Sequence, residues 1–302
     1  MRGSAPFQNV IAKQFPVDFS LQPRRGFPSL RSVCNCIMES FITDIESRGY
    51  CVLPKVFSSA TTDKALELVA GWYEETAGKL PESIPFLARS QPMVYNLQNK
   101  DLFFVKLLFQ SELIEKLLTH FLNDTWYKQI PQDQPNYILR SFVGRTSKGA
   151  LPLHIDSCVP YLGDYVYSIQ CSFILQDQSR ENGCTLVVPG SHKSGRYVED
   201  QGVIKDAIPV ESKAGDVVVW DSRLWHGATA NESGDTRWAL IATFGRWWLK
   251  QVFNITQNLP AEIYRELTDK QKSVLGFCSV PYEDEFEGID MRRGYAESFK
   301  PV

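Results

Sequence analysis

Five short segments rich in β-branched and aromatic residues constrain the fold of this chain more than any other feature. They cover residues 137–143, 165–175, 185–188, 217–220 and 238–244. Glycine, aspartate, asparagine and proline separate them, and these residues terminate strands and form turns. Short strands at such intervals predict an antiparallel sandwich or jelly roll.

Helical spacing of apolar residues precedes and follows these strands. Before them, four stretches indicate helices at residues 33–45, 62–78, 101–109 and 111–121; the third is apolar on most sides, and in the others apolar residues recur three or four positions apart. Thr61 or Thr62 can cap the second of these helices, and Ser111 can cap the fourth. Residues 50–56 indicate a short strand after the first helix, and residues 261–267 and 269–275 return to helical character. The sequence therefore predicts a mainly β fold with flanking helices.

Changes in composition along the chain define the expected domain organisation. Residues 1–30 contain four prolines and fit an extended arm, in which residues 1–4 resemble a vector-derived start. Residues 31–302 are expected to form one domain, with a helical part at 31–130, a jelly-roll core at 135–250, and C-terminal helices and a tail at 251–302. Residues 79–100 are rich in Pro, Ser, Gln and Asn, which predicts a long loop of the kind that often carries function.

The charge and composition favour a small-molecule partner. The formal net charge is −3 and no basic block stands out, so the electrostatic footprint of a nucleic-acid or anionic-membrane binder is missing. No apolar run approaches the roughly 18 residues of a membrane-spanning helix, and no targeting signal is visible. Seven cysteines without a C-x-x-C pair favour reduced thiols. We therefore expect a cytoplasmic monomer or homodimer without nucleic-acid or membrane partners.

The stretch from His154 to Arg237 contains residue types that bind metals. His154 and Asp156 are two positions apart, so on an extended strand both side chains leave from the same face. This pattern alone is short and also occurs by chance. His226 follows an apolar strand and has Gly227 beside it, which makes it a sensible third ligand. Two imidazoles and one carboxylate on one face of a divalent metal leave its other face open, as in non-haem Fe(II) oxygenases.

Arg237 is the expected partner of an anion beside this metal site. It begins another apolar strand, where a buried guanidinium is costly without a negative partner. A carboxylate of a bound co-substrate would supply that partner in a bidentate pair. Two other residues of the stretch are expected to be structural, namely His192 in a Pro-Gly-Ser-His turn and Cys158 as a packed thiol.

The order of these motifs resembles the phytanoyl-CoA dioxygenase family of Fe(II)- and 2-oxoglutarate-dependent oxygenases. The similarity covers roughly residues 35–250 and includes the run NGCTLVVPGSH at residues 182–192. It implies a double-stranded β-helix, that is, a jelly-roll or cupin-like core, within a catalytic domain. It also implies iron and co-substrate ligands at matching positions. Iron is assigned to His154, Asp156 and His226, and 2-oxoglutarate to Arg237, Ser172, Arg140 and Thr229.

The reaction implied by the resemblance consumes O2 and 2-oxoglutarate, releases succinate and CO2, and hydroxylates an unactivated C–H bond of a small-molecule metabolite. Desaturation, ring formation or epimerisation in a biosynthetic pathway can arise from the same oxidant. The substrate is expected to contact residues that precede or follow the metal motif. These are Tyr95, Asn96, Phe142 and Tyr161.

Two readings from other classes remain open at this point. One is a non-catalytic metal-binding jelly-roll protein. Such a protein is expected to have lost a metal ligand or the arginine, but this chain retains the three candidate ligands and Arg237, which counts against this alternative. The other is a metal-dependent hydrolase or isomerase, which has no use for Arg237 as a carboxylate clamp. The sequence does not select the substrate, because one fold hosts many reactions.

Overall fold

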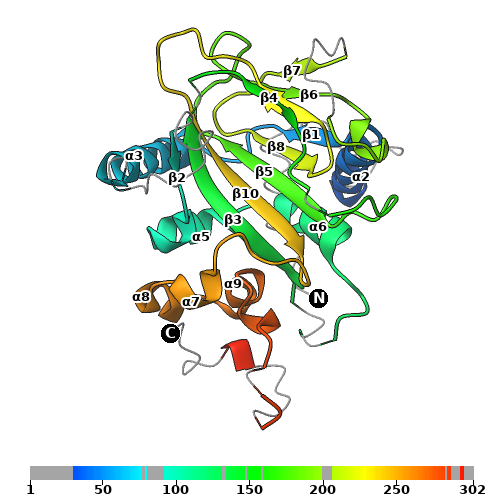
Figure 1. The fold of residues 1–302 in the computed structure, drawn as a ribbon, viewed down its shortest axis with the longest axis vertical. Coiled ribbons are helices and arrows are strands. Elements are labelled where there is room, and N and C mark those ends of the chain that lie inside the picture. Colours follow the sequence, from blue (N-terminus) through cyan, green and yellow to red (C-terminus); the bar gives the residue numbers. More distant parts are fainter. Residues whose placement is uncertain are drawn as a thin grey trace.

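Two antiparallel sheets form the centre of the computed structural model, and helices flank the larger one (Figure 1). The structure describes residues 30–76, 79, 92–128, 130, 134–146, 148–157, 159–198, 206–282, 284–286 and 293–295. The predicted N-terminal arm, most of the predicted loop at 79–100, and Cys158 therefore lie outside the described residues.

The larger sheet has six strands, and all its neighbouring strands are antiparallel. Their order across the sheet is β1 (Tyr50–Leu53), β8 (Val217–Asp221), β5 (Ser168–Ile174), β10 (Trp238–Arg246), β3 (Tyr137–Thr146) and β2 (Met93–Val94). The smaller sheet has the order β4 (Leu151–His154), β9 (His226–Ala228), β6 (Thr185–Val187) and β7 (Ile208–Val210). Two such sheets form the predicted jelly roll, so the expected fold class is confirmed.

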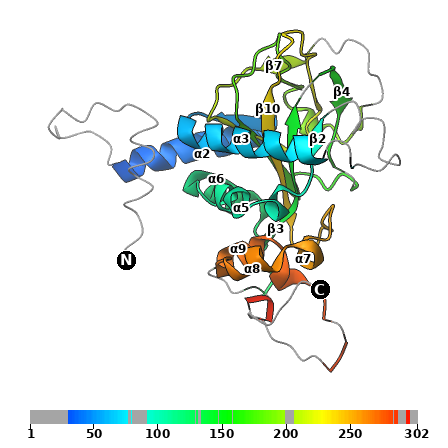
Figure 2. The same ribbon diagram turned by 90° about the vertical axis from the view of Figure 1, so that its left-hand side faces the viewer.

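Helices pack on one face of the larger sheet, and a second group lies near one end of β3 (Figure 2). The first group comprises α2 (Leu30–Arg48), α3 (Ser59–Thr76), α5 (Leu102–Leu108) and α6 (Glu112–Leu122). The second group comprises α7 (Ile255–Asn258), α8 (Ala261–Arg265) and α9 (Asp269–Val274). The helices leave the other face of the sheet turned toward the smaller sheet.

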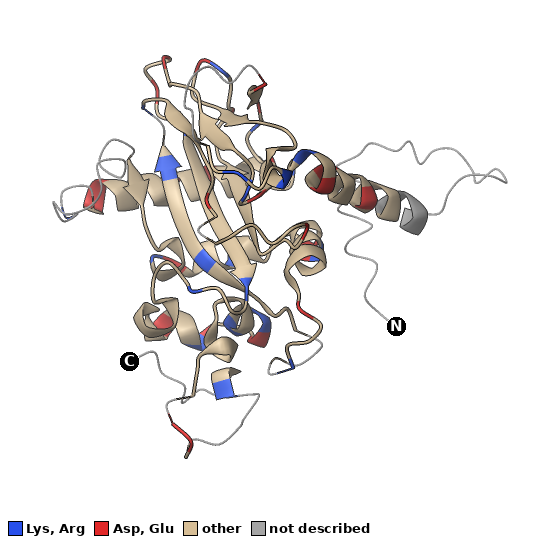
Figure 3. Ribbon diagram, turned by 45° about the vertical axis from the view of Figure 1, so that its right-hand side comes forward, with Lys and Arg blue, Asp and Glu red and all other residues tan. Residues whose placement is uncertain are grey.

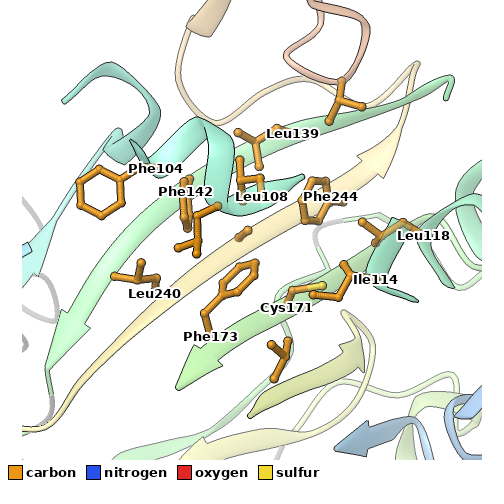
Figure 4. Packing of buried hydrophobic residues seen from close by; sticks show 14 of the residues in the cluster. Phe104, Leu108, Ile114, Leu118, Leu139, Phe142, Cys171, Phe173, Leu240 and Phe244 are labelled. Atoms are coloured by element: carbon orange, nitrogen blue, oxygen red, sulfur yellow. The ribbon is translucent and has the colours of Figure 1, made fainter. Parts of the chain in front are cut away.

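The main hydrophobic core lies between the larger sheet and these helices (Figure 4). Phe104 of α5 meets Phe142 of β3 edge to face, with ring centroids 6.3 Å apart. Phe142 also contacts Phe173 of β5 at 6.0 Å. Burying a large apolar side chain stabilises a fold by about 1.5–3 kcal/mol relative to leaving it exposed. This core therefore holds the larger sheet in place through one face, and the side chains of its opposite face are available to line a functional site.

Several expected boundaries differ from the observed ones for local reasons. The cap of α3 is Ser58, whose Oγ accepts from the amide of Thr61 at 3.2 Å, so the predicted Thr61 or Thr62 cap is wrong. The Ser111 cap of α6 is confirmed, because its Oγ accepts from the amide of Ile114 at 3.4 Å. The strand predicted at residues 217–220 extends to Asp221, and His226 begins the separate strand β9 after a turn.

Among the described residues, no helix combines the length and apolar character needed to cross a bilayer. Acidic and basic residues are interspersed over the helices and loops, and basic residues also occur on the central strands (Figure 3). Three of these basic residues are Arg140 and Arg145 of β3 and Arg246 of β10. Arg246 is buried, and its guanidinium donates to the carbonyls of Val166, Asn123 and Phe121, which offsets the cost of burying its charge.

Candidate active site

The strand pairing of the smaller sheet brings two histidines and one aspartate together. His154 ends β4 and His226 begins β9, and these residues are direct partners in the antiparallel pair. Asp156 follows β4, and its amide donates to the carbonyl of Ser222 at 3.0 Å. One potential ligand atom from each of the three side chains lies within 4.8 Å of the others. The predicted triad thus forms one cluster.

Hydrogen bonds orient the ligand atoms of both imidazoles. The Nδ1 atom of His154 lies 2.9 Å from the carbonyl of Pro152, and the Nδ1 atom of His226 lies 2.9 Å from the carbonyl of Leu224. A carbonyl only accepts, so both Nδ1 atoms carry a proton, and in the neutral form of each ring the Nε2 atom keeps the lone pair that a metal needs. The two Nε2 atoms lie 3.7 and 3.1 Å from the carboxylate oxygens of Asp156. This donor set fits a divalent ion such as Fe(II).

Electrostatics favour the protonation state that a metal requires for two of the three residues, with Asp156 ionised and His154 neutral. Burial would raise the pKa of Asp156, but the charge and hydrogen bond of His226 outweigh it and lower that pKa to about 2. Burial would lower the pKa of His226, and the Asp156 carboxylate raises it instead. The pKa of His154 is lowered by burial and by the neighbouring charge of His226. Asp156 is therefore an ionised ligand at neutral pH.

A cavity of about 270 Å³ lies between the two sheets and includes the triad. Its walls come from β3, β5, β8 and β10 on one side and from β4, β6 and β9 on the other. Of the remaining predicted site residues, Arg237, Ser172 and Tyr95 also line this cavity. Three residues that are far apart in sequence thus share one cavity with the three candidate metal ligands.

Arg237 has the properties expected of an anion-binding group. Its side chain is buried, and its Nε atom has no hydrogen-bond partner among the described residues. Burial, and secondly the charge of Arg145, lower the pKa of Arg237 to about 10, so it remains charged at neutral pH. A buried guanidinium with an unsatisfied N–H is stabilised by a carboxylate. This observation fits a bound dicarboxylate such as 2-oxoglutarate.

Phe142 does not line the cavity, which corrects one expected substrate contact. Alternate residues of a strand point to opposite faces, so Ser141 and Val143 face the cavity while Phe142 faces the helices. Figure 4 shows Phe142 among the core residues, and its side chain is fully buried there. A substrate in the cavity cannot reach it.

Four other expected contacts also lie outside the lining of the cavity. Arg140 is the extra residue of a bulge opposite Thr243 and Phe244, and its Nε donates to the carbonyl of Lys250 at 3.0 Å. Thr229 lies past the end of β9, and its amide donates to the carbonyl of Cys184 at 3.0 Å. The Thr229 hydroxyl contacts the thiol of Cys184 at 3.9 Å.

The two remaining expected substrate contacts are held by local interactions. Asn96 adopts a left-handed conformation with φ of 55°, and its side-chain oxygen accepts from Gln98 at 3.2 Å. Tyr161 is half-exposed and donates to the carbonyl of Lys193 at 3.2 Å, in a separate small depression beside Arg223. Neither side chain belongs to the described cavity lining. The expected contacts of Arg140, Thr229, Asn96 and Tyr161 therefore lie outside this cavity lining and stay predictions.

The structure adds cavity residues that the sequence pattern missed. Arg145 lines the cavity; burial lowers its pKa, while Asp156 and Tyr95 act in the opposite direction. The strand was expected to end at residue 143, but β3 continues to Thr146. Side chains alternate between the two faces of a strand, so extending the predicted strand by two residues beyond Val143 would have placed Arg145 on the cavity face. Gln170, Trp220 and Thr243 were missed as well, because the cavity face of each strand was not assigned.

Gly227 permits the close approach of the two strands that carry the histidines. A Cβ atom at this position would lie 2.4 Å from the carbonyl oxygen of Leu151 and 3.2 Å from the carbonyl carbon of Pro152. We expect Gly227→Ala to push β4 away from β9, to lower the free energy of unfolding by more than about 1 kcal/mol, and to weaken Fe(II) binding roughly tenfold or more. Denaturant unfolding and anaerobic Fe(II) titration would measure both effects.

Gly71 offers a matched control for this substitution. It lies in α3, and a Cβ atom there would meet nothing within 4 Å. Gly71→Ala should leave Fe(II) affinity unchanged and should not destabilise the fold, because alanine favours a helix. Wild-type Fe(II) affinity in Gly227→Ala would contradict the link between strand spacing and the metal cluster.

Comparisons with known proteins agree with this architecture. The chain is 34% identical over 118 residues to an uncharacterised protein of Mycobacterium tuberculosis, a match that covers 39% of this chain and 43% of that protein. It is 26% identical over 257 residues to the dioxygenase af480 of Aspergillus fumigatus, covering 81% of this chain and 79% of the relative.

A solved structure supports the fold, and a family model covers most of the core. The structure of HygX from Streptomyces hygroscopicus, with nickel and 2-oxoglutarate bound, is 19% identical with a TM-score of 0.52. That alignment covers 70% of this chain and 88% of HygX. The model of the phytanoyl-CoA dioxygenase family matches residues 45–239, which is more than half of the chain. The chain therefore belongs to the phytanoyl-CoA dioxygenase (PhyH) family.

Proposed function

We propose that this chain is an Fe(II)- and 2-oxoglutarate-dependent dioxygenase that oxidises a C–H bond of a small-molecule metabolite. One observation carries the proposal: the metal triad and the buried, unsatisfied guanidinium of Arg237 line the same cavity. The description of the Aspergillus relative as a dioxygenase supports it. So does the nickel and 2-oxoglutarate bound in HygX. Residues 31–302 would act as one catalytic domain.

The residues of the cavity divide into two binding groups. His154, Asp156 and His226 would hold the iron through two imidazole nitrogens and a carboxylate. Arg237 would bind the distal carboxylate of 2-oxoglutarate, and Ser172, buried on the adjacent wall, would contact the same molecule. When bound, iron and 2-oxoglutarate supply the oxidising chemistry, in which O2 is consumed, succinate and CO2 are released, and a substrate C–H bond is oxidised. The protein itself contributes binding, orientation and exclusion of water.

The size and lining of the cavity limit the substrate. Pockets for drug-sized ligands measure about 300–1,000 Å³, and this cavity of about 270 Å³ would also hold iron and 2-oxoglutarate, so the space left fits only a small metabolite or one end of a larger one. Tyr95 and Phe253 contact each other edge to face at 5.7 Å, and both line the cavity with Val252. This apolar wall favours a substrate with a hydrocarbon part near the reacting carbon.

Hydroxylation is the outcome that the ligand set favours within this proposal. The carboxylate ligand is present as Asp156, whereas halogenating relatives replace it with a small residue. Desaturation, ring formation and epimerisation use the same cofactors, and the position of the substrate radical relative to the metal would decide among them. A non-catalytic metal-binding role gives no reason for the buried charge of Arg237 beside the triad.

The proposal is tested by O2-dependent release of succinate from 2-oxoglutarate. The Fe(II)-loaded protein would be incubated with a panel of small metabolites that have a hydrocarbon part, and succinate and oxidised product would be measured together. Equal amounts of both in the presence of one substrate support the proposal. No succinate above that of the metal-free protein, with any substrate or with 2-oxoglutarate alone, would count against it.

A further inference from the structure

One cross-strand row of the larger sheet consists of polar side chains that face the cavity. Ser141 of β3, Thr243 of β10 and Gln170 of β5 are consecutive register partners on adjacent strands. All three line the cavity. The next residue of the row is Trp220 of β8, whose ring centroid lies 5.2 Å from that of His226. A single row of the sheet therefore reaches the candidate metal cluster.

The three polar side chains form a directed chain of hydrogen bonds that ends on Asp156. Ser141 Oγ donates to Thr243 Oγ1 at 3.0 Å, and Thr243 Oγ1 donates to Gln170 Oε1 at 2.6 Å. Gln170 Nε2 then donates to Asp156 Oδ2 at 2.9 Å. Gln170 and Thr243 are buried, with 3% and 8% exposure, so water does not compete freely for these bonds.

The direction of the chain fixes the orientation of the Gln170 amide. Because the ionised Asp156 carboxylate only accepts, the amide NH2 group must point toward Asp156, which leaves Oε1 to accept from the Thr243 hydroxyl. A flipped amide would place its oxygen against the carboxylate and leave the donor of Thr243 without its acceptor. Thr243 therefore acts on Asp156 through Gln170, and Ser141 supports Thr243 in the same way.

We infer that Gln170 is a positioning residue that fixes the Asp156 carboxylate for metal binding, and that Thr243 locks Gln170 in the required orientation. The inference rests on the proposed function, because it assigns Asp156 to the metal. Asp156 follows β4 in a connecting segment, and Gln170 ties it to a central strand of the larger sheet. The hydrogen bond is charge-assisted, and such bonds are shorter and stronger than neutral ones. Partners of this kind around metal ligands typically contribute 10–100-fold to affinity.

The test is anaerobic calorimetric titration of the apoprotein with Fe(II), without 2-oxoglutarate. Gln170→Leu keeps approximate size and removes the donor, and it should weaken Fe(II) binding by about 10–100-fold. Thr243→Val keeps the side-chain shape and removes the hydroxyl that donates to Gln170 Oε1, and it should cause a smaller loss of Fe(II) affinity. The double variant should match Gln170→Leu alone, because Thr243 then has nothing left to orient. Thermal unfolding of each apoprotein establishes that it is folded.

Ser168→Ala is the matched control for loss of a buried hydrogen bond in the same strand. Ser168 is buried, and its Oγ donates to the carbonyl of Phe244 at 2.9 Å, away from the cavity lining. The Ser168→Ala variant should lower the free energy of unfolding without changing Fe(II) affinity. If Gln170→Leu does not fold, Thr243→Val still decides the question by itself.

Two results would overturn the inference while leaving the proposed function intact. Wild-type Fe(II) affinity in Gln170→Leu, or in Thr243→Val where only that variant folds, would remove the positioning role. Losses in the two single variants that add in the double variant would show that Thr243 acts independently of Gln170. Failure of the wild-type protein to bind Fe(II) is a different result, because it overturns the proposed metal site itself.

Discussion

Replacing Asp156 with alanine should abolish Fe(II) binding at micromolar metal and all O2-dependent succinate release. The variant removes the single carboxylate of the cluster and leaves two imidazoles whose Nε2 atoms no longer face a negative charge. The loss should exceed the roughly 10–100-fold effect typical of residues that only orient a ligand. Anaerobic titration with Fe(II) measures the affinity, and succinate release measures the activity.

An exposed acidic residue outside the site provides the control for this variant. Glu232 is exposed on the loop before β10, so Glu232→Ala changes the net charge by the same amount without touching the cluster. It should bind Fe(II) like the wild-type protein. An Asp156→Ala variant that keeps wild-type affinity would mean that the metal, if it binds, binds elsewhere.

Replacing Arg237 with alanine should separate co-substrate binding from metal binding. Removing one partner of a buried, hydrogen-bonded charge pair costs about 2–5 kcal/mol, which corresponds to roughly 30-fold or more in affinity. We therefore expect 2-oxoglutarate binding to the Fe(II)-loaded protein to weaken by at least that factor. Fe(II) affinity should change little, because Arg237 is not among the clustered ligands.

Arg237→Lys sharpens this test. Lysine keeps the positive charge and loses the planar pair of donors, so 2-oxoglutarate affinity should be intermediate between wild type and alanine. Titration of each variant with Fe(II) and then with 2-oxoglutarate gives both constants. Equal losses of iron and co-substrate affinity in Arg237→Ala would indicate that the arginine only supports the fold.

The metal ligands could be predicted from the sequence because their signals are local. His154 and Asp156 are two residues apart, so they stay close together even though β4 ends at His154 and Asp156 follows it. Arg237 could be predicted because a charge at the start of an apolar strand requires a partner. The structure adds that β4 and β9 are paired with His154 opposite His226. That pairing brings the separate motifs into one cluster.

The remaining cavity residues depend on strand register and bulges, which no short pattern encodes. A shift at Thr243 and Phe244 skips Arg140 and sets Ser141 opposite Thr243. Without that shift, the predicted co-substrate contact at Arg140 would occupy a different position. The predicted substrate contact at Phe142 was wrong for a related reason. Adjacent residues of a strand point to opposite faces, so an error of one residue moves a side chain from the cavity to the core. The chain from Ser141 to Asp156 is thus a product of tertiary structure.

The measurement that tests the central claim most directly is anaerobic titration of the apoprotein with Fe(II) followed by 2-oxoglutarate. A keto acid chelated to Fe(II) gives a weak visible charge-transfer band, so the spectrum reports both ligands in one site. We expect the band in the wild-type protein and its loss in His226→Ala, which lacks one of the clustered ligands. Iron binding by the wild type without any band would contradict the shared cavity as a site for metal and co-substrate.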